Sequence, residues 1–188
     1  RGDARAAGTF IHALLELLPH LPEPLRERAA KAIARASELS AQEQETATAS
    51  ALSLLGGLHF GKVAASRSFA EAELGLLLSH EDGKPYARLL GKVDRIGFDE
   101  GPMVFDYKSR VRAPDGSIAA GYVRQLSCYA AAVERIHGMP VRAALVDLST
   151  HEIVSVSPEM LKDEFDEILR ARKILEPPAP PYSGVTID

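Results

Sequence analysis

Two carboxylates and one ammonium lie on short apolar segments that are typical of β-strands. Asp106 and Lys108 belong to residues 104–108, which read Val-Phe-Asp-Tyr-Lys, and Asp94 lies twelve residues upstream. Side chains two residues apart in a strand share a face, so Asp106 and Lys108 point the same way. A buried charge without a partner is costly. The fold must therefore bring these groups to one another or to a cation.

A hairpin would bring the two carboxylates together. Residues 89–98 form a second strand-like run, in which Asp94 shares a face with Ile96, and residues 99–102 (Asp-Glu-Gly-Pro) form a turn between the runs. Carboxylates held close to each other repel unless a cation lies between them. Mg²⁺ is commonly held by one or two carboxylates, waters and a substrate phosphate. The spacing of Asp106 and Lys108 alone fits a structural ion pair equally well, and Asp94 is what favours a metal site.

Composition limits the classes that remain. The 188 residues, 46% hydrophobic and 26% charged, suffice for one domain with a core. The net charge of −4 argues against strong autonomous binding of nucleic acid, although a local basic patch is compatible with it. The single cysteine, Cys128, excludes a disulfide framework and a four-cysteine metal site. No apolar run approaches the ~20 residues of a membrane span, so we expect a cytoplasmic protein without a membrane partner.

The hydrophobic pattern predicts an α/β fold, with a mixed central sheet flanked by helices and preceded by a helical region. We expect a single domain over residues 1–176, made of the helical region 1–57 and a sheet-and-helix core at 69–175. The Pro-rich residues 177–188 are expected to form an extended tail. The expected helices span residues 3–18, 24–39, 42–55, 119–137 and 158–175, and the expected strands span residues 69–79, 89–98, 104–108, 141–148 and 153–156.

Five sequence segments, in this order, resemble the PD-(D/E)xK nuclease superfamily, which has a restriction-endonuclease-like core. Within it they resemble the RecB-like nuclease domains, and most closely the C-terminal nuclease domain of AddA-type helicase–nucleases. The segments are residues 8–12 (Gly-Thr-Phe-Ile-His), 72–74 (Ala-Glu-Leu), 91–96 (Gly-Lys-Val-Asp-Arg-Ile), 104–109 (Val-Phe-Asp-Tyr-Lys-Ser) and 125–129 (Gln-Leu-Ser-Cys-Tyr).

The resemblance assigns roles to individual residues. It implies that His12, Asp94, Asp106 and the backbone carbonyl of Tyr107 bind the metal, and that Lys108 is the catalytic lysine. It places Gln125 beside the catalytic groups Asp94, Asp106 and Lys108. It also places Tyr129 there, although packing is an alternative role for this tyrosine. The acidic position on the first strand matches Glu73, with Glu71 as a rival on the same face. Basic residues around the acidic cluster, Arg95, Arg110 and Arg124, are candidates for binding DNA.

The implied function is Mg²⁺-dependent hydrolysis of DNA, with Mn²⁺ as a substitute, by an exonuclease acting in double-strand-break repair and recombination. No phosphate-binding loop of the type Gly-x-x-x-x-Gly-Lys-Ser/Thr occurs in the sequence. A helicase motor in the same polypeptide or in a partner, such as an AddB-like subunit, would therefore supply the DNA. The alternatives are a catalytically silent docking or DNA-channel module and an unrelated α/β protein.

Overall fold

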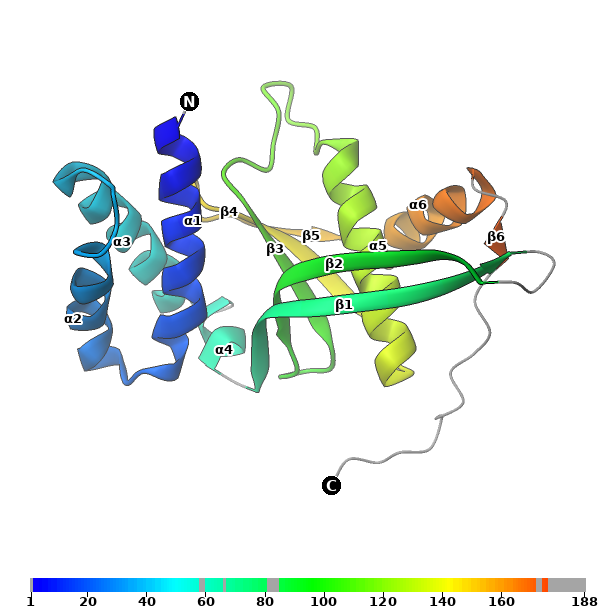
Figure 1. The fold of residues 1–188 in the computed structure, drawn as a ribbon, viewed down its shortest axis with the longest axis horizontal. Helices are drawn as coiled ribbons and strands as arrows, with labels where there is room; N and C mark the ends of the chain where they lie inside the picture. The colour runs from blue at the N-terminus through cyan, green and yellow to red at the C-terminus, as the bar shows by residue number, and fades with distance from the viewer. Residues whose placement is uncertain (1, 58–59, 66, 81–84, 172–173, 176–188) are drawn as a thin grey trace.

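The computed structural model describes residues 2–57, 60–65, 67–80, 85–171 and 174–175, and Figure 1 shows how their elements are arranged. The helices are α1 (Gly2–Leu17), the 3₁₀ turn η1 (Leu18–His20), α2 (Glu23–Ala34), α3 (Ala41–Gly56), α4 (Phe60–Ala65), α5 (Ala120–His137) and α6 (Pro158–Ala171). The strands are β1 (Ser68–His80), β2 (Pro85–Gly97), β3 (Met103–Lys108), β4 (Arg142–Asp147), β5 (Ile153–Val156) and β6 (Ile174–Leu175).

The strands form one mixed sheet in the order β5-β4-β3-β2-β1-β6. The β3–β4 pair is parallel, and the other neighbours are antiparallel. A parallel pair needs a long crossover connection, and α5 supplies it between β3 and β4. The predicted α/β architecture, with a mixed sheet and an N-terminal helical region, is confirmed.

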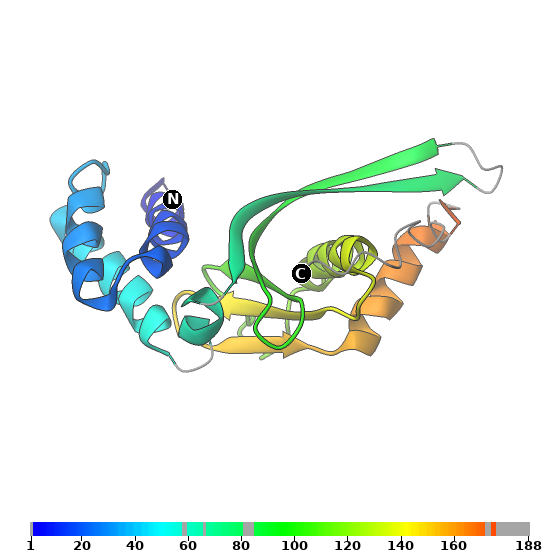
Figure 2. The ribbon, with the colours of Figure 1, turned by 90° about the horizontal axis from the view of Figure 1, so that it is seen from below.

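Each face of the sheet has its own hydrophobic core. Phe105 and Tyr107 of β3 pack with residues of α1, α3 and α4, whereas Val104 of the same strand packs with α5 and α6 residues such as Leu126 and Leu161. Figures 1 and 2 show the N-terminal helices on one side of the molecule and α5 and α6 on the other. The alternation along β3 therefore decides which side chains look toward which helical layer.

The sheet forks beside the acidic residues. The β2–β3 ladder consists of three pairs, Arg95 with Phe105, Ile96 with Val104 and Gly97 with Met103. Before Arg95, β2 stays with β1, while β3 continues alongside β4. Figure 2 shows the long β1–β2 hairpin curving away from β3, β4 and β5. Asp94 and Asp106 are the next residues past the last pair, so both carboxylates lie at the point where the strands separate.

Local sequence explains where several helices begin and end. Helix α3 starts with a capping box, in which Ser40 accepts from the Glu43 backbone and Glu43 accepts from the Ser40 backbone. Helix α5 ends at Gly138, which adopts φ +66° and donates to Glu134 O at 2.7 Å. None of the helices among the described residues is long and apolar enough to cross a membrane.

Some predicted boundaries are wrong. The second helix ends at Ala34 rather than near residue 39, and the last helix ends at Ala171 rather than near residue 175. Residues 174–175 instead pair with the end of β1 as a two-residue strand. The sequence pattern gave no assignment for residues 58–68, where the short helix α4 forms. The predicted Pro-rich tail lies outside the described residues.

Candidate metal centre and active site

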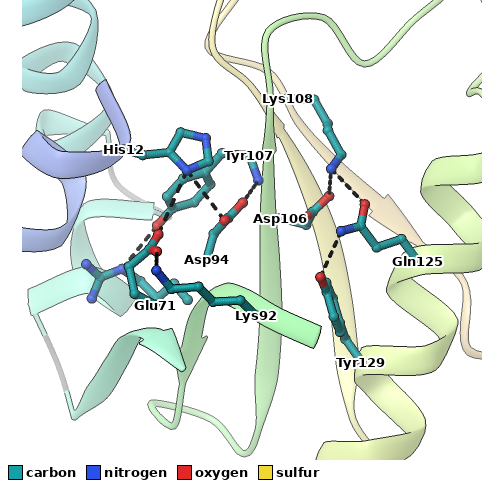
Figure 3. Close-up of polar contacts among 10 residues, drawn as sticks. His12, Glu71, Lys92, Asp94, Asp106, Tyr107, Lys108, Gln125 and Tyr129 are labelled. Atoms are coloured by element: carbon teal, nitrogen blue, oxygen red, sulfur yellow. Dashed lines mark hydrogen bonds and ion pairs between the residues drawn. The ribbon is translucent and has the colours of Figure 1, made fainter. Parts of the chain in front are cut away.

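Three side chains from three elements form a cluster that could hold a metal ion. His12 of α1, Glu71 of β1 and Asp94 of β2 each offer one ligand atom, and these atoms lie within 4.8 Å of one another. His12 Nδ1 is 3.4 Å from Asp94 Oδ1 and 3.9 Å from Glu71 Oε1 (Figure 3). We call His12, Glu71 and Asp94 the metal cluster. It joins the N-terminal helical region to the sheet.

An irregularity in β1 brings Glu71 into this cluster. Glu71 adopts φ +53°, a left-handed conformation that is uncommon for residues other than glycine. The β1–β2 ladder has the pairs Ala70–Arg95 and Ala72–Val93 but no pair between Glu71 and Asp94. Strained backbone of this kind is concentrated at functional sites. The structure thus brings the rival acidic residue, Glu71, to His12 and Asp94.

Glu73 lies elsewhere. It is exposed and is paired with Lys92 in the β1–β2 register. The prediction that placed Glu73 at the acidic position of the site is therefore corrected in favour of Glu71. Regular alternation would keep both glutamates on one face of the strand, and the left-handed conformation at Glu71 breaks that alternation.

Asp94 is held by a backbone group that the fork leaves without a strand partner. Its Oδ2 accepts a hydrogen bond from Tyr107 N at 2.5 Å. Backbone N–H groups that are buried need an acceptor, and at the fork β2 no longer offers a backbone carbonyl. The predicted alternation around Asp94 also fails here, because Val93 and Ile96, three residues apart, pack in the same core. The proposed role of the Tyr107 carbonyl as a metal ligand stays a prediction.

A second group of side chains, which we call the lysine cluster, consists of Asp106, Lys108, Gln125 and Tyr129. Lys108 Nζ lies 2.5 Å from Asp106 Oδ2 and donates to Gln125 Oε1 at 2.9 Å. Gln125 Nε2 in turn donates to Tyr129 Oη at 2.8 Å (Figure 3). The predicted sharing of one face by Asp106 and Lys108 is confirmed. Gln125 and Tyr129 lie one turn apart on α5, as their spacing predicts.

One residue that contacts the lysine cluster was not singled out from the sequence. The ring of Tyr122, on the first turn of α5, lies 5.0 Å from Lys108 Nζ. An ammonium over an aromatic face is attracted by the ring quadrupole. The helical spacing could have indicated Tyr122, because it precedes Gln125 by three residues and therefore lies on the same side of the helix.

Burial and neighbouring charges shift the pKa values of two ionisable groups in this region. Burial raises the pKa of Asp106 to about 6; Lys108 opposes the shift, and the Asp94 charge adds to it. Asp106 Oδ2 is buried without a well-oriented hydrogen bond, although its distance to Lys108 Nζ is that of an ion pair. Burial lowers the pKa of His12, but a hydrogen bond to Asp94 and the charges of Asp94, Glu71 and Asp106 outweigh it and raise that pKa.

The three arginines predicted to bind DNA have different environments. Arg110 is exposed just after β3. Arg124 is also exposed, but its Nε donates to Glu164 Oε1 at 2.7 Å. Arg95 has no exposed surface and bonds only within the protein. Its predicted contact with DNA is therefore wrong, because the Arg95 side chain points into the core beneath α1.

The donors of the metal cluster fit a divalent cation. Carboxylate oxygens suit Mg²⁺ and Mn²⁺, and an imidazole nitrogen suits Mn²⁺ and other transition ions. Asp106 lies outside the three-residue set and is turned toward Lys108, yet its charge acts on His12 and is coupled to that of Asp94. Lys92 forms an ion pair with the remaining oxygen of Glu71. In the metal cluster, Glu71 is thus balanced by Lys92 and His12, and Asp94 is balanced by His12.

Comparison with known proteins identifies the family. No curated protein matches the sequence. The crystal structure of the "Putative exonuclease" from Eubacterium rectale matches 92% of this chain at 15% identity, with a TM-score of 0.59. The chain spans 66% of that protein's length, slightly less than two thirds.

A second solved structure, of SSO0001, matches 85% of the chain and 74% of its own length at 16% identity, with a TM-score of 0.39. The family model of the PD-(D/E)XK nuclease superfamily matches residues 1–181. Because that match covers nearly the whole chain, the protein belongs to the PD-(D/E)XK nuclease superfamily.

Proposed function

We propose that this protein is a metal-dependent deoxyribonuclease that hydrolyses phosphodiester bonds, with Mg²⁺ as the cofactor and Mn²⁺ as a substitute. Membership of a nuclease superfamily supports the reaction class. The observation that carries the proposal is the position of the Asp106–Lys108–Gln125 chain beside the metal cluster (Figure 3). In metal-dependent hydrolysis of a phosphodiester, the cation activates the phosphate and a water, and a positive group close to it stabilises the charge that develops.

The residues of the candidate site have two roles, which are binding the cation and stabilising the reacting phosphate or water. His12, Glu71 and Asp94, together with Asp106, would hold the cation. A bound divalent cation polarises a phosphoryl oxygen and lowers the pKa of a bound water. Lys108 is the general acid–base or electrostatic group, because its ammonium is half-buried and adjacent to Asp106. It would stabilise the negative charge that develops on the phosphate or orient the attacking water.

Gln125 and Tyr129 position the lysine. Lys108 has several rotatable bonds, and its ammonium would otherwise sample many places. The carbonyl of Gln125 accepts from it, and Tyr129 fixes the amide of Gln125. This chain of contacts restricts Lys108 to the side of β3 that faces α5.

The finer role follows the AddA-type resemblance. We propose that the chain is the nuclease domain of a helicase–nuclease, that it acts as an exonuclease in double-strand-break repair and recombination, and that it receives DNA from a helicase motor. The acidic net charge of −4 supports a module that is fed with substrate rather than one that captures it alone.

The test is nuclease activity of the full chain on end-labelled linear DNA. We expect nucleotide release with Mg²⁺, loss of release with EDTA and with Asp106→Ala, and a decrease of about 10²-fold or more with Lys108→Met. Lys31→Met is the matched control, because Lys31 also pairs with a carboxylate, Glu27 Oε1 at 2.6 Å, but on an exposed helix surface. Folding of each variant is checked by circular dichroism.

Two results would contradict the proposal. A folded protein that releases no nucleotide with either cation would favour the silent docking module, particularly if it still binds a helicase. Activity that survives both Asp106→Ala and Lys108→Met would place the chemistry elsewhere in the chain.

A further inference from the structure

Arg95 is the largest side chain that is completely buried among the described residues. Its three nitrogens donate to three different elements: Nη2 to Leu15 O of α1 at 2.5 Å, Nη1 to Ser68 Oγ of β1 at 2.7 Å, and Nε to Tyr107 Oη of β3 at 3.2 Å. A buried guanidinium is costly unless its donors are satisfied. No ion pair joins Arg95 to a carboxylate of the described residues, so these neutral acceptors fix its plane.

The hydrogen bond from Arg95 to α1 satisfies a backbone carbonyl that has no donor in the helix. The donor four residues after Leu15 in a regular helix is residue 19, and Pro19 has no N–H. The Leu15 carbonyl, at the buried end of α1, therefore lacks its helical partner. Arg95 Nη2 supplies the missing donor and ties this end of the helix to the sheet.

The same bonds fix the spacing between metal ligands. His12 lies one turn before Leu15 on α1, and Asp94 directly precedes Arg95 on β2. Tyr107 connects the two: its ring packs edge-on against the His12 ring at 5.1 Å, its hydroxyl accepts from Arg95, and its backbone N–H donates to Asp94. Moving Arg95 would therefore shift His12 relative to Asp94.

We infer that Arg95 is a positioning residue, which holds His12 of α1 against Asp94 and thereby sets the affinity of the metal cluster for a divalent cation. This role rests on the proposed function, because it requires that the cluster binds a cation. The planar fork of arginine presents donors on three separate nitrogens, one to each acceptor, whereas the donors of a lysine all lie on a single nitrogen.

The test is a double-mutant cycle read by Mn²⁺ binding, measured by electron paramagnetic resonance titration of the full chain. The four proteins are the unaltered chain, Arg95→Lys, His12→Ala and the double variant. Residues that orient metal ligands change affinity by about 10–100-fold, so we expect Arg95→Lys to weaken Mn²⁺ binding about tenfold. In the His12→Ala background the same substitution should cause no further weakening.

The matched control is Arg142→Lys. At the surface, the Arg142 guanidinium donates to the side-chain carboxylate and to the backbone carbonyl of Glu100. The substitution should leave the Mn²⁺ affinity unchanged. Should Arg95→Lys fail to fold, Tyr107→Phe takes its place, because it removes one acceptor of Arg95 while keeping the ring against His12. A weakening that depends on His12 is expected there too.

The outcomes separate this role from the proposed function. Equal weakening in both backgrounds, or no weakening in a folded Arg95→Lys protein, would overturn the positioning role and leave the metal site standing. Failure of the unaltered chain to bind Mn²⁺ would overturn the metal site itself, and the role of Arg95 with it.

Discussion

At the scale of single residues, Asp106 shows the conflict that a metal would resolve. Its carboxylate is almost fully buried and lies 2.5 Å from Lys108 Nζ. Even with that ammonium beside it, burial raises its pKa from 3.8 to about 6. Ionised Asp106 is therefore a cost to the folded, metal-free protein at neutral pH, and a cation would offset that cost.

Replacing Asp106 by asparagine should stabilise the metal-free protein. Since the folded pKa is raised, the protonated acid favours folding, and this contribution is lost as the pH rises from about 4 to about 6. Asp106→Asn avoids the loss, so at pH 7.5 its free energy of unfolding should be higher by on the order of 1–3 kcal/mol. The difference should vanish below pH 4. Urea unfolding at both pH values, with EDTA present, measures it.

Asp166→Asn is the control, because Asp166 pairs with Lys162 at 2.6 Å on an exposed helix and such pairs contribute little. Lower stability of Asp106→Asn at pH 7.5 would mean that the ion pair with Lys108 outweighs burial. Mg²⁺ should also raise the melting temperature of the unaltered chain more than that of Asp106→Asn.

At the scale of elements, regular structure could be predicted and its interruptions could not. The strand at residues 104–108 and the helix at 119–137 follow simple periods, so the shared face of Asp106 and Lys108 and the turn spacing of Gln125 and Tyr129 were accessible from the sequence. The left-handed conformation of Glu71 could not be predicted, because the residue type does not indicate it. Arg95 was misplaced for a related reason: its partner, the Leu15 carbonyl, comes from a helix eighty residues away.

The contact between β2 and α5 should control the lysine cluster. A Cβ added to Gly91 would lie 2.5 Å from Cε1 of Tyr129, so Gly91→Ala must displace that ring and remove the partner of Gln125. We expect the nuclease rate to fall about tenfold, which is less than the roughly 10²–10⁴-fold that an acid–base group itself contributes, because Tyr129 acts only through Gln125; the melting temperature should change little. Gly121→Ala is the matched control, since its Cβ would meet nothing within 4 Å. Equal rates for the two variants would show that Tyr129 does not position Gln125.

At the scale of the whole molecule, the candidate active site combines residues from layers that pack on opposite faces of one sheet. The helix α1 brings His12 from one layer, α5 brings Gln125 from the other, and the forked sheet supplies the carboxylates between them (Figure 3). The hydrophobic pattern predicted this layering. The distances among the ligands depend on packing between distant segments, which a pattern cannot give.

The charge of the whole chain predicts weak capture of DNA. The net charge is −4, and of the three predicted DNA-binding arginines Arg95 is buried and Arg124 is paired with a carboxylate, so the protein offers little net positive charge to phosphates. We expect a dissociation constant in the micromolar range or weaker at physiological salt, as for non-specific binding. Fluorescence anisotropy with labelled DNA in EDTA measures it. Nanomolar affinity would contradict a module that depends on a motor for its substrate.

The fork in the sheet also divides the β1–β2 hairpin into a part that positions Asp94 and a part that does not. Only three residue pairs, 95–97 with 103–105, register β2 against β3, and a slip of one residue there would carry Asp94 to the opposite side of the strand. Among the described residues, the β1–β2 pairs from Gly75–Leu90 outward include no member of the metal cluster. A change in the length of the hairpin beyond those pairs would therefore alter the surface that it presents to other molecules while leaving Asp94 and Asp106 in place.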